Sequence, residues 1–179
     1  MALSLAEQKE AARLLEENFF AKVRLPRNAI VAAYWPVRGE INVLPLLLRL
    51  VEKGHPAALP QTVDRHTPLI FRAWKENTPM IKGAFAGLSE PDPAFADIVL
   101  PDVLLMPLLG FDAQGNRLGY GGGHYDRSIG ILDSVRGNLL KIGVGYAFQQ
   151  FDAIPAEKHD VRLDMMVTDR QVFNFGVKK

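Results

Sequence analysis

A glycine-rich segment between Arg117 and Asp126 holds the residues whose types and spacing are best suited to chemistry. Four glycines within five positions allow the backbone to take positive φ angles and to approach a ligand closely. Where such a turn leads into a helix, successive backbone amides form a site for an anion. Arg117 can add a bidentate contact to phosphate, and Asp126 can hold a Mg²⁺ ion that bridges phosphate oxygens. The segment therefore predicts a site for nucleotide phosphates.

This segment matches neither of two common nucleotide-binding motifs. It lacks the Gly-Lys-Ser/Thr sequence of a P-loop, and the dinucleotide fingerprint would require a glycine where His124 stands. A flexible turn between a strand and a helix is the simplest alternative. Because Arg117 precedes the glycines and Asp126 and Arg127 follow them, the phosphate site is favoured over that turn.

The elements that must position this segment alternate along the chain. Ser4 and Glu7 have the spacing of a capping box, and Asn42 and Gly54 are a candidate N-cap and a stop for a second helix. Apolar periodicity predicts helices over 5–21 and 43–52 and from about His124. It predicts strands over 29–35, 55–60, 69–74, 139–146 and 165–168, a further strand within 98–106, and a loop over 89–93.

Strands that alternate with helices imply an α/β fold with a largely parallel sheet and helices on both faces. The length of 179 residues fits a single domain over 1–179. Ligands in such folds bind beyond the carboxyl ends of the strands. The glycine-rich segment follows the strand predicted within 98–106, which places it at such an end.

Composition excludes several classes of protein. The 21 basic and 20 acidic residues leave no charge excess that would indicate a nucleic-acid or membrane partner. The absence of cysteine excludes disulfides, thiolate zinc sites and a cysteine nucleophile. No apolar run is long enough to span a bilayer, and no secretory signal pattern opens the chain, so we expect a soluble, cytoplasmic protein. The oligomeric state is left open.

A longer pattern around the glycines resembles the 5-formyltetrahydrofolate cyclo-ligase family, also called methenyltetrahydrofolate synthetases. The match runs from Pro107 to Asp112, includes Gly115, and continues from Arg117 to Arg127. The resemblance covers about residues 4–169 and implies a three-layer α/β/α sandwich like that of sugar-phosphate isomerases. Shorter matching pieces are Tyr34–Glu40, His55–Pro60, Glu90–Pro91, Gly145–Tyr146 with Gln149, Pro155, His159–Asp160 and Asp164.

The resemblance also implies a reaction. Members of the family use ATP and Mg²⁺ to convert 5-formyltetrahydrofolate into 5,10-methenyltetrahydrofolate, with release of ADP and phosphate. The formyl oxygen attacks the γ-phosphate, the folate N10 adds to the activated carbon, and phosphate leaves. The protein's part in such chemistry is positioning and charge neutralisation.

Residue by residue, the resemblance implies three sets of contacts. Asp126 and Asp160 are expected to be the Mg²⁺ carboxylates, and Arg117 and Tyr125 are expected to act in catalysis. Trp35, Glu40 and the loop from Tyr120 to His124 are expected to bind the reduced folate, with Glu40 hydrogen-bonded to the pterin ring. The expected ATP contacts are Arg117, Leu118, Gly119, Tyr120, Gly121, Gly122, Gly123, His124 and Tyr125.

Taken alone, several of these residues have simpler interpretations. Asp126 would be a first-turn helix acid favoured by the helix dipole, Asp160 an ordinary loop acid and Glu40 a surface turn acid. His124 is a nucleotide contact or a packing substitute for tyrosine.

Two departures from the family pattern favour a second hypothesis. The family normally opens with a basic helix that contacts ATP phosphates, and this sequence starts after it. Some members also have Lys at the position of Gly122 and Tyr at the position of His124. The second hypothesis is therefore a paralogue that binds ATP or folate with weak or no turnover. A sugar-phosphate or acyl-transfer enzyme on a similar fold is a third.

Overall fold

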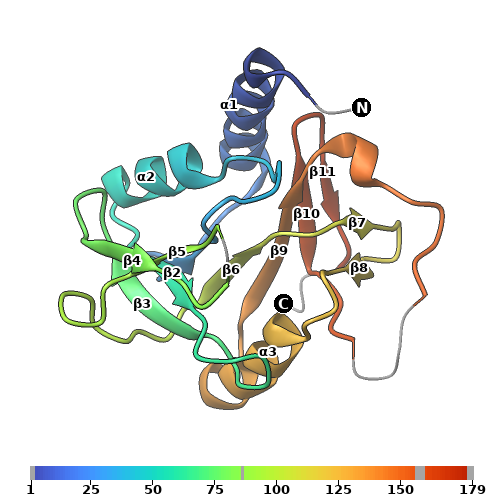
Figure 1. Cartoon of the computed structure of the whole chain (residues 1–179). Coiled ribbons are helices and arrows are strands. Elements are labelled where there is room, and N and C mark those ends of the chain that lie inside the picture. Colours follow the sequence, from blue (N-terminus) through green and yellow to red (C-terminus); the bar gives the residue numbers. More distant parts are fainter. Residues whose placement is uncertain (1–2, 86, 156–159, 177–179) are drawn as a thin grey trace.

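A seven-stranded sheet forms the centre of the computed structural model, which describes residues 3–85, 87–155 and 160–176 (Figure 1). The five inner strands run parallel, and the strands at both edges are antiparallel to their neighbours. In spatial order the strands are β11 (Val172–Asn174), β10 (Met165–Thr168), β9 (Leu140–Gly145), β6 (Val103–Met106), β1 (Val31–Ala32), β2 (Ala57–Gln61) and β3 (Ile70–Trp74).

Helices cover both faces of this sheet. Helices α1 (Leu5–Lys22) and α2 (Leu44–Glu52) pack on one face, and α3 (His124–Arg136) packs on the other (Figure 1). Successive residues of a strand point to opposite faces, so Val103 and Leu105 join the core under α1 and α2 while Leu104 and Met106 join the core under α3. The predicted α/β class and mostly parallel sheet are confirmed. The likeness to sugar-phosphate isomerases stays a prediction.

Two hairpins stand outside the main sheet. One pairs β4 (Met80–Lys82) with β5 (Ser89–Pro91), and the other pairs β7 (Gly110–Phe111) with β8 (Arg117–Leu118). The second hairpin carries Arg117 to the start of the glycine-rich loop. A short 3-10 turn, η1 (Ala147–Gln149), follows β9.

A buried carboxylate closes the β7–β8 hairpin. Asp112 is 1% exposed and accepts hydrogen bonds from the amides of Gln114, Asn116 and Ile154 and from the Asn116 side chain, at 2.8–3.0 Å. Burial alone would raise the pKa of Asp112, but these donors outweigh it and lower the pKa. The carboxylate therefore fixes the turn that precedes β8.

Several predicted boundaries are wrong, for local reasons. The apolar run 29–35 contributes only Val31–Ala32 to the sheet. The strand predicted within 98–106 is present as Val103–Met106, and Ile98 only bridges to Arg72. The predicted loop over 89–93 contains β5. The Ser4–Glu7 capping box is confirmed, whereas the N-cap of α2 is Val43 and not Asn42.

None of the helices in the described part of the chain has both the length and the apolar character that a membrane crossing requires.

Candidate functional site

The glycine-rich loop connects β8 to the N-terminus of α3. Gly121 and Gly123 have φ angles of +82° and +62°, in the region that glycine enters without strain. Gly123 is the N-cap of α3, and no side chain caps this helix. The amides of the first helical turn have no partner within a helix, so the end of α3 presents several unsatisfied donors and the positive end of the helix dipole. This arrangement suits an anion.

Arg117 lies beneath the loop and not at its surface. Its side chain is 7% exposed, and its Nη2 donates to Asp126 Oδ1 at 2.9 Å. The guanidinium carbon lies 5.8 Å from the centre of the Tyr125 ring. A Cβ atom placed on Gly119 would lie 3.1 Å from Arg117 Nη1, so the glycine lets the loop pass directly over the guanidinium.

The fold brings the two expected Mg²⁺ carboxylates into the same region. Besides Arg117, Asp126 Oδ1 accepts a hydrogen bond from the amide of Val161 at 3.3 Å. Asp160 is exposed and directly precedes Val161, so its backbone is close to Asp126 although the two residues are distant in the sequence. Among the residues that the structure describes, no group of three or more His, Cys, Asp or Glu side chains forms a ready metal site.

Glu40 joins the segment after β1 to the glycine-rich loop. Its Oε2 accepts a hydrogen bond from the amide of Val37 at 2.9 Å, and the nearby Tyr120 hydroxyl lowers the pKa of the carboxyl. The Arg38 guanidinium lies 5.9 Å from the centre of the Tyr120 ring. Partial burial raises the pKa of Glu40 against the opposing effect of its hydrogen bonds.

The charge of Glu40 acts on three tyrosines. The pKa of Tyr34, Tyr120 and Tyr125 is raised first by burial and then by the charge of Glu40, to about 12 in Tyr120. All three phenols are therefore protonated near neutral pH. Tyr34 donates its hydroxyl hydrogen to Ile41 O at 2.8 Å, and Trp35 packs against the core under α1 and α2. The site thus combines a carboxylate with aromatic side chains.

His124 is held from outside the loop by residues 62–69, which we call the strap. His124 Nδ1 lies 3.3 Å from Thr67 O and 3.4 Å from Arg127 Nη2, so the ring nitrogen donates to the carbonyl in one tautomer and accepts from the guanidinium in the other. The Ser128 hydroxyl accepts from the amide of Leu69 at 2.8 Å and donates to His124 O at 2.6 Å. The imidazole lies over Gly122, where a Cβ atom would be 2.9 Å from His124 Cδ2.

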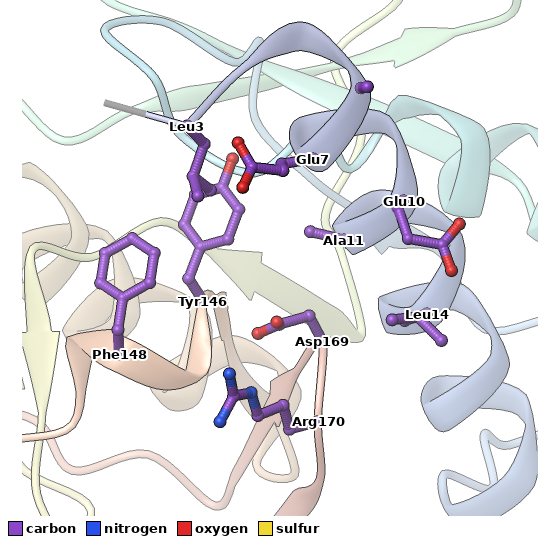
Figure 2. Close-up of a pocket in the computed structure, with 10 residues that line it drawn as sticks. Leu3, Glu7, Glu10, Ala11, Leu14, Tyr146, Phe148, Asp169 and Arg170 are labelled. Atoms are coloured by element: carbon purple, nitrogen blue, oxygen red, sulfur yellow. The ribbon is translucent and has the colours of Figure 1, made fainter. Parts of the chain in front are cut away.

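A separate groove of about 460 Å³ lies between the N-terminal half of α1 and the segment that follows β9 (Figure 2). Tyr146 and Phe148 stack on one wall with ring centres 5.0 Å apart, and Ala11 and Leu14 line the other. None of the binding residues expected from the sequence lines this groove. Because Tyr146 follows β9, the groove lies at the carboxyl edge of the sheet.

Sequence reasoning assigned no role to the strap, and although it counted Arg127 in favour of the phosphate site and Tyr34 in a matching segment, it gave neither side chain a specific contact. Tyr34 follows β1, and the rule that ligands bind beyond the carboxyl ends of parallel strands was a signal for it. The strap has no comparable signal, because its contacts with α3 are made mainly by backbone carbonyls, which any residue supplies.

Comparison with known proteins agrees with this architecture. The sequence profile of the 5-formyltetrahydrofolate cyclo-ligase family matches residues 1–169. A 5-formyltetrahydrofolate cyclo-ligase of Haemophilus influenzae is 31% identical over 172 residues, covering 92% of this chain and 89% of that protein. The one from Escherichia coli K12 is 29% identical, covering 97% and 96%.

Solved structures show the same likeness. The 5,10-methenyltetrahydrofolate synthetase of Aquifex aeolicus superposes with a TM-score of 0.79 at 28% identity, covering 99% of this chain and 87% of that one. The enzyme of the same name from Mycoplasma pneumoniae gives 0.72 at 25% identity, covering 94% and 91%.

Proposed function

Because this chain belongs to the 5-formyltetrahydrofolate cyclo-ligase family, we propose that it converts 5-formyltetrahydrofolate into 5,10-methenyltetrahydrofolate with ATP and Mg²⁺, releasing ADP and phosphate. The observation that carries this proposal is that the glycine-rich loop lies between a surface suited to phosphates and a surface suited to a flat polar ring. The uncapped end of α3 supplies donors for phosphates, and the Glu40–Tyr120 pair supplies polar and aromatic contacts for a flat ring.

On the phosphate side, the amides at the end of α3 bind the oxygens that the reaction transfers. Arg117 adds positive charge from beneath the loop, where its low exposure limits screening by water. Asp126 and Asp160 would hold Mg²⁺, since carboxylate oxygens are the ligands that this ion prefers. When bound, the ion neutralises charge on the phosphate oxygens.

On the folate side, Glu40 binds the pterin through its hydrogen-bonding groups. A neutral or charged carboxyl can pair with the amide-like edge of this ring, and Tyr120 and Trp35 offer aromatic faces. The loop residues from Tyr120 to His124 belong to both surfaces. The formyl group is thereby placed next to the phosphate that it must attack.

The reaction that this placement supports has two steps. The formyl oxygen forms a bond to the γ-phosphorus, and the bond to ADP breaks. N10 then forms a bond to the formyl carbon and loses its proton, and the carbon–oxygen bond to phosphate breaks. Arg117 and Tyr125 act at the first step, Arg117 by stabilising charge on the phosphoryl group and Tyr125 by packing on the guanidinium.

A spectroscopic assay for 5,10-methenyltetrahydrofolate tests the proposal. We expect product from 5-formyltetrahydrofolate only when both ATP and Mg²⁺ are present. Folded protein that forms no product from these three components would contradict the proposal.

The Arg117–Asp126 ion pair is the observation that favours a second candidate, a paralogue that binds ATP or folate without efficient turnover. In this structure each charge already neutralises the other. Calorimetric titration with ATP, with and without Mg²⁺, separates the two functions: binding without product identifies the paralogue, and binding with product identifies the cyclo-ligase.

A further inference from the structure

We propose that Arg127 is a positioning residue that aims the backbone of the glycine-rich loop at the bound phosphates. This inference rests on the proposed function, because it takes the loop as the phosphate site. The inference gives a role to the Arg127 side chain, which contacts the loop from the side of the strap.

The evidence begins with the contacts of the guanidinium. Arg127 Nη2 donates to Gly122 O at 2.8 Å and to Arg65 O, in the strap, at 3.1 Å. Arg127 Nη1 faces Gly123 so closely that a Cβ atom on that residue would lie 2.7 Å away. The guanidinium therefore fills the space between the loop and the strap, and its Nη2 hydrogens are directed at carbonyl oxygens.

The contact between Arg127 and the Gly122 carbonyl also determines which way the Gly123 amide points. In a trans peptide the C=O of one residue and the N–H of the next point to opposite sides. Because the Gly122 carbonyl points toward Arg127, the Gly123 amide points away from Arg127, to the other side of the loop. Gly123 is the N-cap of α3, so its amide is one of the donors that this end of the helix leaves without an intrahelical partner.

Glycine is needed at position 123 for two separate reasons. Its φ of +62° disfavours a side chain, and the guanidinium occupies the place where a Cβ would be. His124 completes the arrangement, since its Nδ1 lies between Thr67 O at 3.3 Å and Arg127 Nη2 at 3.4 Å. His124 and Arg127, both in the first turns of α3, thus attach the loop to the strap.

Lysine at position 127 would keep the positive charge but lose the planar guanidinium, which places Nη1 against Gly123 while Nη2 donates to two carbonyls. We expect Arg127→Lys and Arg127→Met to weaken binding of inorganic tripolyphosphate and of Mg·ATP by roughly tenfold each, the change that about 1.4 kcal/mol produces. In turnover, KM for ATP should rise by a similar factor.

Arg136→Lys is the matched control. Arg136 lies on the same helix and also donates to a backbone carbonyl, that of Leu100, but at the opposite end of α3. This variant should bind both probes like the unmodified protein.

Amide NMR of the unliganded protein provides the second readout. The Gly122 and Gly123 amide signals should move or broaden in Arg127→Lys and stay in place in Arg136→Lys, with most other signals unchanged. Wild-type binding by Arg127→Lys, or unmoved glycine signals, would overturn the inference. Wild-type protein that binds neither probe would contradict the proposed function, while the NMR result would still decide the role of Arg127.

Discussion

Arg117 Nη2 lies 2.9 Å from Asp126 Oδ1, so the side chain expected to attract phosphate is bound to the side chain expected to attract Mg²⁺. Asp126 Oδ1 also accepts from the amide of Val161. The ion pair keeps Arg117 in place beneath the loop and leaves the second oxygen of Asp126 as the one to offer to a metal. Loop, helix and the segment around Asp160 are thus joined at one carboxylate.

Asp126→Asn separates the structural and catalytic parts of this arrangement. The amide oxygen still accepts from Arg117, so we expect a melting temperature within a few degrees of wild type. Loss of the carboxylate should lower turnover by roughly 100-fold or more. Mutation of residues that only hydrogen-bond to metal ligands already lowers metal affinity or activity by about 10–100-fold. Asp133→Asn, on the same helix, is the control and should keep full activity. An active Asp126→Asn protein would exclude Asp126 as a metal ligand.

Glu40→Gln should change how stability depends on pH. Partial burial raises the pKa of Glu40 above its ordinary 4.5, so the folded protein binds this proton more tightly than the unfolded chain does. The free energy of unfolding of the wild type therefore falls as pH rises from about 4.5 through the raised pKa, and glutamine removes this contribution. Urea denaturation of both proteins across this range measures the difference. Parallel curves would mean that Glu40 is solvated like an ordinary surface acid.

The same Glu40→Gln variant is expected to raise KM for the reduced folate and to leave KM for ATP unchanged. Glu52→Gln, at the exposed end of α2, serves as the control. An equal rise in both KM values would place Glu40 outside the folate surface.

Asp112→Ala should destabilise the protein by about 3 kcal/mol or more, because it leaves several buried donors without an acceptor. The pKa of Asp112 is lowered, so its contribution is present above 3.8 and is lost as pH falls through the folded pKa. The stability difference between variant and wild type should therefore shrink in acid. Urea titrations at neutral and acidic pH measure this, and a pH-independent difference would contradict the assigned cause.

Gly130→Ala should stabilise the protein by about 0.5–1 kcal/mol, the usual gain from replacing a helical glycine. Gly130 is exposed within α3, and a Cβ atom there has nothing within 4 Å. Gly123→Ala should instead destabilise the protein, because the φ of Gly123 is positive and Arg127 occupies the Cβ position. Thermal melting distinguishes the two variants, and destabilisation by Gly130→Ala would show that the helix is not regular at this point.

The sequence predicted the elements more reliably than their ends. Apolar periodicity identified the helices and the inner strands, because burial on one or both faces leaves a strong pattern. It failed at 29–35, where the residues are mostly buried but only Val31 and Ala32 pair within the sheet. A run of apolar residues indicates burial, but it does not show which residues will find a neighbouring strand for their backbone hydrogen bonds.

For the site, the sequence predicted residues with distinctive chemistry but did not predict the contacts that fix their positions. Arg117 and Asp126 stood out by type and position, but their mutual ion pair was not foreseen, since it depends on the path of the loop over Gly119. Glu40 and Tyr120 were both expected at the folate, and their contact with each other follows only from the fold. The roles in binding and catalysis stay predictions until the experiments above are done.

The place of β1 in the sheet has a consequence for how the protein is synthesised. On one side, Val31 pairs with Ala57, which leaves the ribosome soon after it; on the other, it pairs with Val103. The amide of Ile30 likewise donates a hydrogen bond to Asp102, which is 72 residues further along the chain and is synthesised later. In a nascent chain, one edge of β1 therefore lacks its hydrogen-bonding partner until β6 has been translated. During this interval the unpaired edge is exposed to aggregation and to binding by chaperones.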